Sequence, residues 1–580
     1  MTKKDDDLEL PLGKRTPTYR FFEILPGAVS YSMILLLVVL SILSPTLGAI
    51  YLLIIITITL VKAVGAAVRT VQGYNEIQRA MKVDWHQRLL DLKEPHKNFE
   101  RLRGVEQGKM EKVMEAVVEK KDELASRVVK NRKGGENDKQ GDNDQAFEFA
   151  EHVENLRAMS VSPKDFPDPD KIYHAVIMVA YDEGMETLLP TVEAVRDTEF
   201  PNERIIFVLG YEERGGPEME ERAKELAEKF KDTFHEFIAV KHPNGLPKEI
   251  KGKGPNLTYA GKVLAEYVEK KHIPFEHVVV TSLDSDNRMS PKYLDYVAYE
   301  YVVHENRKRM AFQPVSLFMN NIWDAPAPMR VVAVSNSFFN VINVKRPHLI
   351  RNFASHSQPL DALYEMDFWS KRTIVEDGHQ YWRSLFHFRG KYNVISIKVP
   401  IYQDAVIAET FLKTLKAQFV QLRRWDYGAS DVAYVGDRMI NPERRRMPLY
   451  VLFPKFVRLL DGHVTLAAMS PMVAFGGWVP RLFNLQTRDL LTYNLPNTVS
   501  WIQLGAMVGL MVTIFMSLRM LPPRPKKYNK MRSFGMVLQW IISPLIAIAY
   551  QSFVAFYAQT RLLTGRYMEN FDVTRKVVKK

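Results

Sequence analysis

The chain has 580 residues, of which 46% are hydrophobic and 25% charged, and its formal net charge at pH 7 is +12. It contains no cysteine, which excludes disulfides, thiolate catalysis and cysteine-ligated zinc. No nucleic-acid-binding motif accompanies the positive charge, and the basic clusters lie near apolar runs. The charge therefore favours anionic lipid or phosphorylated ligands over nucleic acid.

Two apolar runs near the start of the chain predict a helical hairpin in a membrane. Residues 27–44 and 49–67 are each close to the ~20 residues that cross a bilayer, and a turn is expected at 45–48. A cleaved signal peptide is the alternative for the first run, but the mixed-charge leader and the second run disfavour it. Lys62 and Arg69 flank the end of the second run, so the positive-inside bias places the leader and the chain after the hairpin in the cytoplasm.

The segment 83–170 is strongly charged. Residues 111–131 have helical spacing with a thin apolar stripe, and residues 130–144 form a polar, low-complexity stretch. We expect a solvated helical insert with a flexible loop.

From His174 onward, short apolar runs alternate with amphipathic stretches. Strands are predicted at 174–180, 204–210, 235–242 and 277–283, and helices at 184–196, 217–231 and 257–271. Such alternation indicates a parallel α/β sheet, in which ligands bind at the carboxyl ends of the strands.

Three further apolar stretches follow residue 445, at 463–482, 498–518 and 534–558. The loop 521–533 between the last two is basic and has no acid, and the tail after Gln559 is also basic, so both are expected in the cytoplasm. If the two N-terminal runs and all three of these stretches cross the membrane, the five spans would instead place the tail outside the cell. The stretch 463–482 contains Pro471 and two glycines, so an interfacial or re-entrant segment remains the alternative to a span.

These patterns divide the chain into six parts. They are a cytoplasmic leader (1–24), a transmembrane hairpin (25–69), a charged helical insert (70–170), an α/β domain with an interfacial helix (171–445), a transmembrane region (446–558) and a basic tail (559–580).

Asp284 and Asp286 directly follow the last predicted strand. Two carboxylates at this spacing can share one Mg²⁺ or Mn²⁺, which also binds substrate phosphates. A solvated Asp-Ser-Asp turn is the alternative.

Glu376 and Asp377 lie about ninety residues later. Asp377 is a candidate general base for an acceptor hydroxyl. It can also serve as N-cap of a helix over 378–386, and the two roles are compatible.

Gln421, Arg424 and Trp425 end an amphipathic helix that starts at Thr410. A guanidinium can form a bidentate hydrogen bond to two phosphate oxygens, and an indole offers a flat surface for a sugar ring. A basic membrane-surface helix with an aromatic anchor is the alternative.

The order of these motifs, followed by apolar spans, resembles the membrane-bound family-2 glycosyltransferases of the cellulose synthase and hyaluronan synthase type. The resemblance covers about residues 172–425 and the flanking spans. It implies a cytoplasmic α/β catalytic domain of the GT-A (Rossmann-like) type flanked by transmembrane helices. It also implies an integral membrane protein, with the plasma membrane of a prokaryote as the expected location.

The resemblance assigns roles to residues of this chain. Asp284 and Asp286 would bind Mg²⁺ or Mn²⁺, and Asp377 would be the general base, with Glu376 beside it. The residues expected at the nucleotide-sugar donor are Tyr181, Glu183, Glu212, Lys251, Lys253, Asn256 and Asp284, and which of the two lysines matches is left open. The residues expected at the diphosphate and the acceptor are Gln421, Arg424 and Trp425.

The sequence departs from the family at three points. A glutamate follows the second strand where an aspartate is usual, which weakens the inference of a uracil base, although a UDP-sugar stays the first expectation. Leu422 replaces a polar residue, and no domain for cyclic-dinucleotide control follows. Five histidines show no ligand spacing and are expected in packing or surface roles: His304, His348, His356, His379 and His387.

Three functions remain open from the sequence. The first is inverting, metal-dependent transfer of a sugar to a growing glycan, as in processive polysaccharide synthesis. The second is transfer of one sugar to a polyprenyl-phosphate or lipid acceptor, and the third is an inactive membrane scaffold for another synthase. In all three the partners include membrane lipids and no nucleic acid.

Overall fold

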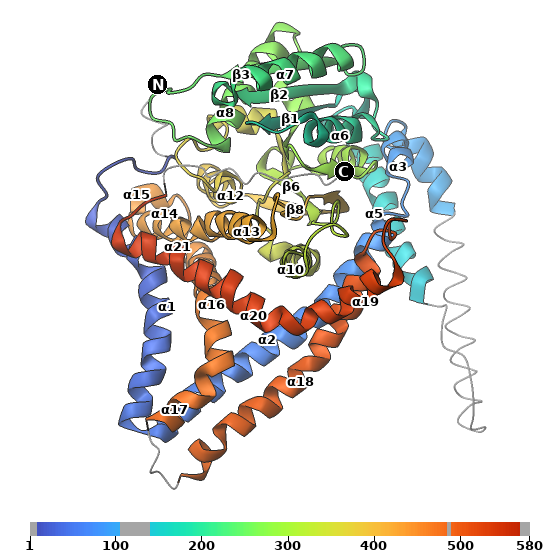
Figure 1. The fold of residues 1–580 in the computed structure, drawn as a ribbon. Coiled ribbons are helices and arrows are strands. Elements are labelled where there is room, and N and C mark those ends of the chain that lie inside the picture. Colours follow the sequence, from blue (N-terminus) through green and yellow to red (C-terminus); the bar gives the residue numbers. More distant parts are fainter. Residues whose placement is uncertain (1–7, 105–139, 484–488, 569–580) are drawn as a thin grey trace, which may run out of the picture.

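The computed structural model describes residues 8–104, 140–483 and 489–568. An α/β domain lies at one end of the molecule and long helices extend from it (Figure 1). Residues 111–131, for which a helix is predicted, lie outside the described residues.

The α/β domain is built on one sheet of eight strands in the order β3-β2-β1-β4-β7-β6-β8-β5. The strands are β1 (Tyr173–Ala180), β2 (Ile205–Glu212), β3 (Glu236–His242), β4 (Val278–Asp284), β5 (Arg288–Met289), β6 (Met310–Leu317), β7 (Ser357–Pro359) and β8 (Asn393–Tyr402). β1 and β2 are almost wholly buried, because helices cover both faces of the sheet.

The sheet is mixed, whereas the sequence predicts a parallel one. β3, β2, β1 and β4 are parallel, but β7 pairs antiparallel with both β4 and β6. β7 has only three residues, and its alignment comes from contacts with its neighbours rather than from an apolar run of its own. No sequence pattern therefore predicts β7.

Helices surround the sheet. They are α6 (Met185–Arg196), α7 (Gly216–Phe230), α8 (Lys253–Lys270), α9 (Tyr293–Val303), α10 (Ala327–Asn343), α11 (Leu360–Glu365), α12 (Glu376–His387), α13 (Phe411–Asp426), α14 (Asp431–Ile440) and α15 (Pro442–Arg445). The α/β domain with flanking apolar helices confirms the predicted fold class.

The charged insert packs against α9 through α3 (Trp85–Asp91) and α5 (Gln140–Val161). The Trp85 ring stacks on Tyr296 with ring centroids 3.5 Å apart, and His152 bridges Tyr299 and Asp91. Residues 140–144, predicted as part of a flexible loop, are the first turn of α5. Tertiary anchoring of α5 at His152 extends the helix into a sequence that is polar by composition.

The helices below the domain are α1 (Pro17–Leu43), α2 (Pro45–Ala80), α16 (Leu449–Phe475), α17 (Val479–Leu482), α18 (Leu490–Met520), α19 (Lys530–Leu538), α20 (Ser543–Ile546) and α21 (Phe553–Thr564). Within the described residues, four helical segments are long and apolar enough to cross a membrane: Pro17–Leu43, Pro45–Ala80, Leu490–Met520 and Lys530–Thr564. The chain is thus a membrane protein by the length and composition of its helices.

The turn predicted at 45–48 is wrong in extent. Only Ser44, with φ −160° and ψ 119°, separates α1 from α2. Pro45 starts α2, because a proline at the first helical position loses no hydrogen bond that the helix would otherwise make.

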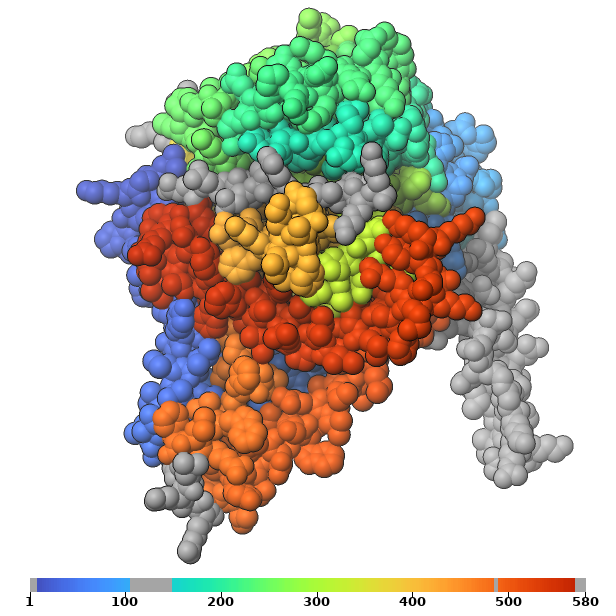
Figure 2. Space-filling model, in the orientation of Figure 1, coloured from blue at the N-terminus to red at the C-terminus, as the bar shows by residue number. Residues whose placement is uncertain are grey.

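The segment Lys530–Thr564 differs in direction from the other long helices. It passes across the border between the α/β domain and the helices below, where Figure 2 shows it as a continuous band. Tyr550 Oη donates to the Leu415 carbonyl at 3.2 Å, and Gln559 Nε2 donates to the His463 carbonyl at 2.9 Å. Its exposed apolar side chains recur every three to four residues, as on a helix lying at a membrane surface: Met531, Phe534, Leu538, Ile541 and Leu545.

α16 takes the path of a spanning helix instead. It leaves the domain at Lys455, whose Nζ donates to Tyr381 Oη at 2.9 Å, and extends beside α1 toward α17 (Figure 1). At its far end Gly476 lies against Leu37 and Leu52, near the junction of α1 and α2. Because charged residues in its first half lower its hydropathy, α16 is not one of the four apolar segments named above.

The segment before α1 is attached to the α/β domain. Ser370 Oγ donates to Glu9 Oε2 at 2.6 Å, and Arg383 forms a buried ion pair with Glu9 at 3.3 Å. Tyr434 Oη also donates to the Leu8 carbonyl at 3.0 Å. This segment and the α/β domain therefore lie on the same side of the helices.

Close approach of α2 to α10 at Gly73 gives a test of this packing. A Cβ at Gly73 would lie 2.1 Å from the carbonyl oxygen of Val341, which is backbone and has little room to move. We expect Gly73→Ala to lower the free energy of unfolding by about 1–3 kcal/mol, measured by thermal unfolding in detergent. Gly505→Ala on α18, where a Cβ meets no atom within 4 Å, is the matched control and should not lower it, because alanine favours a helix more than glycine does.

Candidate functional site

Three strands bring the predicted site residues to one edge of the sheet. Val179 of β1 is paired with Asp284 of β4, and Ala180 is paired with Tyr211 of β2. Since these strands are parallel, their carboxyl ends align at this edge. Residues separated by about one hundred positions in sequence are thereby neighbours.

A buried lysine joins the two predicted carboxylate motifs. Lys253 Nζ lies 2.7 Å from Asp284 Oδ1 and 2.7 Å from Asp377 Oδ2. Glu376 Oε1 lies 3.7 Å from the same ammonium. Lys253 thus holds the end of β4 and the start of α12 together, and it is this lysine, not the exposed Lys251, that contacts the carboxylates.

Burial and charge set the protonation of this cluster. Burial would lower the pKa of Lys253, but the three carboxylates around it raise its pKa above the usual lysine value. Burial and, after it, the charge of Asp377 raise the pKa of Glu376 to about 8. Glu376 therefore favours its protonated form near neutral pH, and Asp377 remains the candidate base.

The local geometry at the start of α12 leaves Asp377 available for chemistry. α12 begins at Glu376, and the residue before it, Val375, makes no side-chain capping bond. Asp377 is thus inside the first turn rather than the N-cap, so the capping alternative is wrong. A Cβ on Gly254 would lie 2.2 Å from the Ser370 carbonyl oxygen, so only glycine permits α8 to begin this close to the cluster.

Tyr181 and Glu183 follow β1, the strand paired with β4, and Glu212 ends β2. The Tyr181 backbone N–H donates to Glu183 Oε2 at 2.6 Å, and burial raises the pKa of Glu183. Arg214 pairs with Glu212 and places its guanidinium 5.0 Å from the centre of the Tyr181 ring. Arg214 was not singled out from sequence, because only the fold brings it over a ring more than thirty positions away.

Asn256, one of the residues expected at the donor, makes structural contacts with two strand ends. Its Nδ2 donates to the Gly210 carbonyl at 3.1 Å and to the Ala180 carbonyl at 3.5 Å. The residue is buried and its Oδ1 has no hydrogen-bond partner. Asn256 joins the ends of β1 and β2, and only Oδ1 remains for a further donor.

The Gln421, Arg424 and Trp425 motif lies at the end of α13, which begins after the N-cap Thr410 as predicted. Gln418 Nε2 donates to Gln421 Oε1 at 3.1 Å, and Trp425 packs against Phe318 with ring centroids 5.9 Å apart. Against the larger effect of burial, the positive charge of Arg424 lowers the pKa of Glu376. The structure therefore brings this motif near the carboxylates of α12.

Two histidines that the sequence placed in packing roles lie beside the site. His356 Nδ1 is 4.0 Å from Asp377 Oδ1 and 2.8 Å from the Phe353 carbonyl, and burial lowers the pKa of His356. His379 Nδ1 lies 2.6 Å from Asp431 Oδ1. No spacing in the sequence marks either contact, because β7 and α14 come from distant segments.

The carboxylates fit a metal that the substrate helps to bind. Among the described residues no group of three or more carboxylates and histidines could hold a metal ion without other ligands. Mg²⁺ and Mn²⁺ are commonly bound by one or two carboxylates plus substrate phosphates, which is the arrangement that Asp284 and Asp286 offer. The half-buried position of both residues leaves this edge accessible to such a ligand.

No protein-family model matches the chain, and no curated protein is similar to it in sequence. Among solved structures it is similar to the mannosyltransferase PcManGT from Pyrobaculum calidifontis in complex with GDP-Man and Mn²⁺, with 14% identity, 68% of this chain and 93% of that chain covered, and a TM-score of 0.36. S. aureus TarS 1–349 follows with 11% identity, coverage of 68% and 93%, and a TM-score of 0.32. GalNAc-T7 with UDP, GalNAc and Mn²⁺ has 10% identity, coverage of 51% and 58%, and a TM-score of 0.30. The similar structures are glycosyltransferases.

The raised pKa of Glu376 gives a pH-dependent stability. The folded protein retains a proton that the unfolded chain loses near its ordinary pKa of 4.5, so the free energy of unfolding falls as pH rises from 4.5 through about 8. We expect Glu376→Gln to flatten this fall, measured as melting temperature against pH. Glu94→Gln, at an exposed ion pair with Lys97, should leave the slope as in the wild type. Equal slopes for the wild type and Glu376→Gln would contradict the assignment.

Proposed function

We propose that the chain is an inverting, metal-dependent membrane glycosyltransferase that uses a nucleotide-sugar donor. The observation that carries this proposal is the Lys253 cluster, in which one ammonium holds Asp284, at the proposed donor side, and Asp377, the proposed base, each at 2.7 Å. A UDP-sugar is the first expected donor. The proposed donor residues Tyr181 and Glu212 lie at the neighbouring strand ends.

The proposed reaction is a single in-line displacement. The acceptor hydroxyl oxygen forms a bond to the anomeric carbon, its proton passes to Asp377, and the bond from that carbon to the diphosphate breaks with inversion. A Mg²⁺ or Mn²⁺ ion held by Asp284 and Asp286 would neutralise charge on the departing nucleoside diphosphate. Lys253 fixes the two aspartates relative to each other, while Gln421, Arg424 and Trp425 would contact the diphosphate and the acceptor.

The acceptor is proposed to be a growing glycan held at the membrane, in polysaccharide synthesis. A single transfer to a lipid-linked phosphate is the second candidate, and a group of arginines described below favours a phosphate on the acceptor side. The inactive-scaffold alternative does not account for a base candidate, a metal pair and a buried lysine that meet at one edge of the sheet.

We also propose a topology. α1, α2, α16 and α18 cross the membrane, while Lys530–Thr564 lies at its cytoplasmic surface. The even number of spans then places the leader, the α/β domain, the basic loop 521–533 and the basic tail on one side. This proposal removes the disagreement between span number and positive charge that five spans create.

Catalysis is tested by a donor screen on the purified protein in detergent with Mg²⁺ or Mn²⁺, reading nucleoside diphosphate release and product size. We expect Asp377→Asn to lower kcat by about 10²–10⁴-fold, since it removes the base, and chelation of the metal to abolish release. Asp284→Asn should be similarly impaired.

Asp367→Asn is the matched control for these variants, because Asp367 is also held by two lysines, Lys262 and Lys371, at 2.7 and 2.8 Å, but outside the cluster. It should retain near wild-type activity. Full activity in both Asp284→Asn and Asp377→Asn, or no release with any donor, would reject the proposed function.

The topology is tested by cysteine labelling, which the cysteine-free chain makes direct. Single variants Lys164→Cys in the domain, Asn494→Cys on α18 and Arg566→Cys after α21 are treated with a membrane-impermeant thiol reagent in intact cells. In intact cells we expect labelling at position 494 alone. After permeabilisation, positions 164 and 566 should be labelled as well. Labelling of 566 in intact cells would show that Lys530–Thr564 spans the membrane.

A further inference from the structure

Four arginines converge below the proposed base, at the border between the α/β domain and the membrane helices. They are Arg69 on α2, Arg346 and Arg351 in the segment after α10, and Arg458 on α16. Within the described residues, none of their guanidinium groups makes a hydrogen bond or an ion pair. Arg69 Nε is buried without a partner.

The helix packing explains how the four come together. Lys62 on α2 pairs with Asp461 on α16 at 3.1 Å, and these two helices run in opposite directions. Moving from this pair toward the domain, Arg69 follows about 10 Å along α2 and Arg458 about 4.5 Å along α16. The close contact of Gly73 with the Val341 carbonyl then places Arg69 beside the end of α10, where Arg346 follows.

Electrostatics agree with this convergence. Burial and the neighbouring charges of Arg69 and Arg458 lower the pKa of Arg346. Burial lowers the pKa of Arg351 as well, and its guanidinium lies 5.5 Å from the centre of the Trp382 ring. Arg69, Arg346 and Arg351 are half-buried and Arg458 is exposed. Like charges gathered in such a place are unfavourable without an anion, so the cluster is suited to bind one.

α12 connects this cluster to the site. Trp382, which contacts Arg351, and Tyr381, which accepts from Lys455, lie about one turn after Asp377 on that helix. Tyr381 is four residues from Asp377 and therefore faces the same side of α12. Arg351 thus lies against the second turn of α12, and α16, which carries Arg458, contacts the same turn through Lys455.

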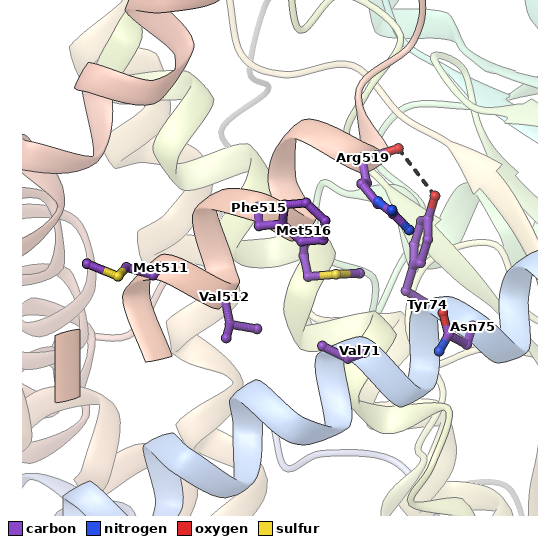
Figure 3. Close-up of a pocket in the computed structure, with 8 residues that line it drawn as sticks. All are labelled: Val71, Tyr74, Asn75, Met511, Val512, Phe515, Met516 and Arg519. Carbon is purple, nitrogen blue, oxygen red and sulfur yellow. Dashed lines mark hydrogen bonds between the residues drawn. The ribbon is translucent and has the colours of Figure 1, made fainter. Parts of the chain in front are cut away.

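A single arginine at the same border provides a contrast. Arg519 lies beside a groove of about 460 Å³ between α2 and α18, which Figure 3 shows. The groove is otherwise mostly apolar, and the Arg519 guanidinium lies 4.8 Å from the centre of the Phe515 ring. One guanidinium on an aromatic ring is the usual arrangement at a membrane surface, whereas four without an ion-paired carboxylate are not, although the charge of Asp431 acts on Arg351.

We propose that Arg69, Arg346, Arg351 and Arg458 bind the phosphate of a membrane lipid that carries the acceptor. Guanidinium groups form bidentate hydrogen bonds to phosphate oxygens, and two of the four arginines stand on α2 and α16, which the proposed topology places in the membrane. The phosphate is held on the membrane side while the group to be glycosylated extends past Tyr381 toward Asp377. This deepens the proposed function and rests on it only in taking the bound lipid to be the acceptor.

The test measures binding, not turnover, on the purified full-length protein in detergent. The probes are a long-chain polyprenyl monophosphate, the uncharged polyprenol of the same length and inorganic pyrophosphate. We expect the polyprenyl phosphate to bind at least about tenfold more tightly than the polyprenol. Arg346→Gln with Arg458→Gln should weaken it by about tenfold or more, each lost guanidinium removing charge-assisted bonds.

Arg519→Gln is the matched control and should change this affinity less than about twofold, since a general attraction of anions would affect both variants alike. Nucleotide-sugar binding should be unchanged in every variant, which shows that they are folded. Equal binding of polyprenol, unchanged affinity in the double variant, or an equal loss in Arg519→Gln would overturn the proposal. Pyrophosphate binding as tightly as the lipid, with the same arginine dependence, would reject the lipid and leave a soluble anion.

An absence of sugar transfer with every donor would reject the proposed function and leave this binding result standing. Conversely, a lack of lipid-phosphate binding beside normal sugar transfer would reject only the present inference.

Discussion

The proposed site depends on the ion pairs of the Lys253 ammonium with Asp284 and Asp377. The ammonium neutralises carboxylates that come from two separate elements, the end of β4 and the start of α12, and that would otherwise repel one another in a partly buried place. Desolvation of a lysine is costly, and three carboxylates offset that cost. The position of α12, and with it the distance between the proposed donor and acceptor sides, follows from this contact.

Negative and positive side chains lie near different turns of α12. Carboxylates lie at its first turn, where the sheet edge lies, and Arg351 of the proposed arginine cluster contacts Trp382 one turn later. The first group suits a cation bridged to a diphosphate, and the second suits a phosphate on the membrane side. A helix of twelve residues thus connects the two proposed sites of opposite charge, which suits the proposed transfer from a soluble donor to a lipid-borne acceptor.

The helices below the domain combine two orientations. α1, α2, α16 and α18 extend away from the domain, while Lys530–Thr564 lies across their domain-side ends and contacts α10, α13 and α16. The ends of the chain are tied together at this level, since Arg15, Arg20 and Tyr567 all donate to Glu23 of α1. The α/β domain therefore rests on a layer of helix that has one apolar, exposed stripe.

The sequence is sufficient to locate most elements of the α/β domain and to single out the candidate carboxylates. Periodicity located β1, β2, β3, β4 and α13 within a few residues, because each buries a face with its own regular spacing. Three features become visible only in the folded chain. Lys253 rather than Lys251 contacts Asp284 and Asp377, β7 is antiparallel, and Lys530–Thr564 lies across the other long helices. These depend on contacts between distant segments, as does the convergence of the arginines, and a side chain's own neighbours in sequence carry no record of them.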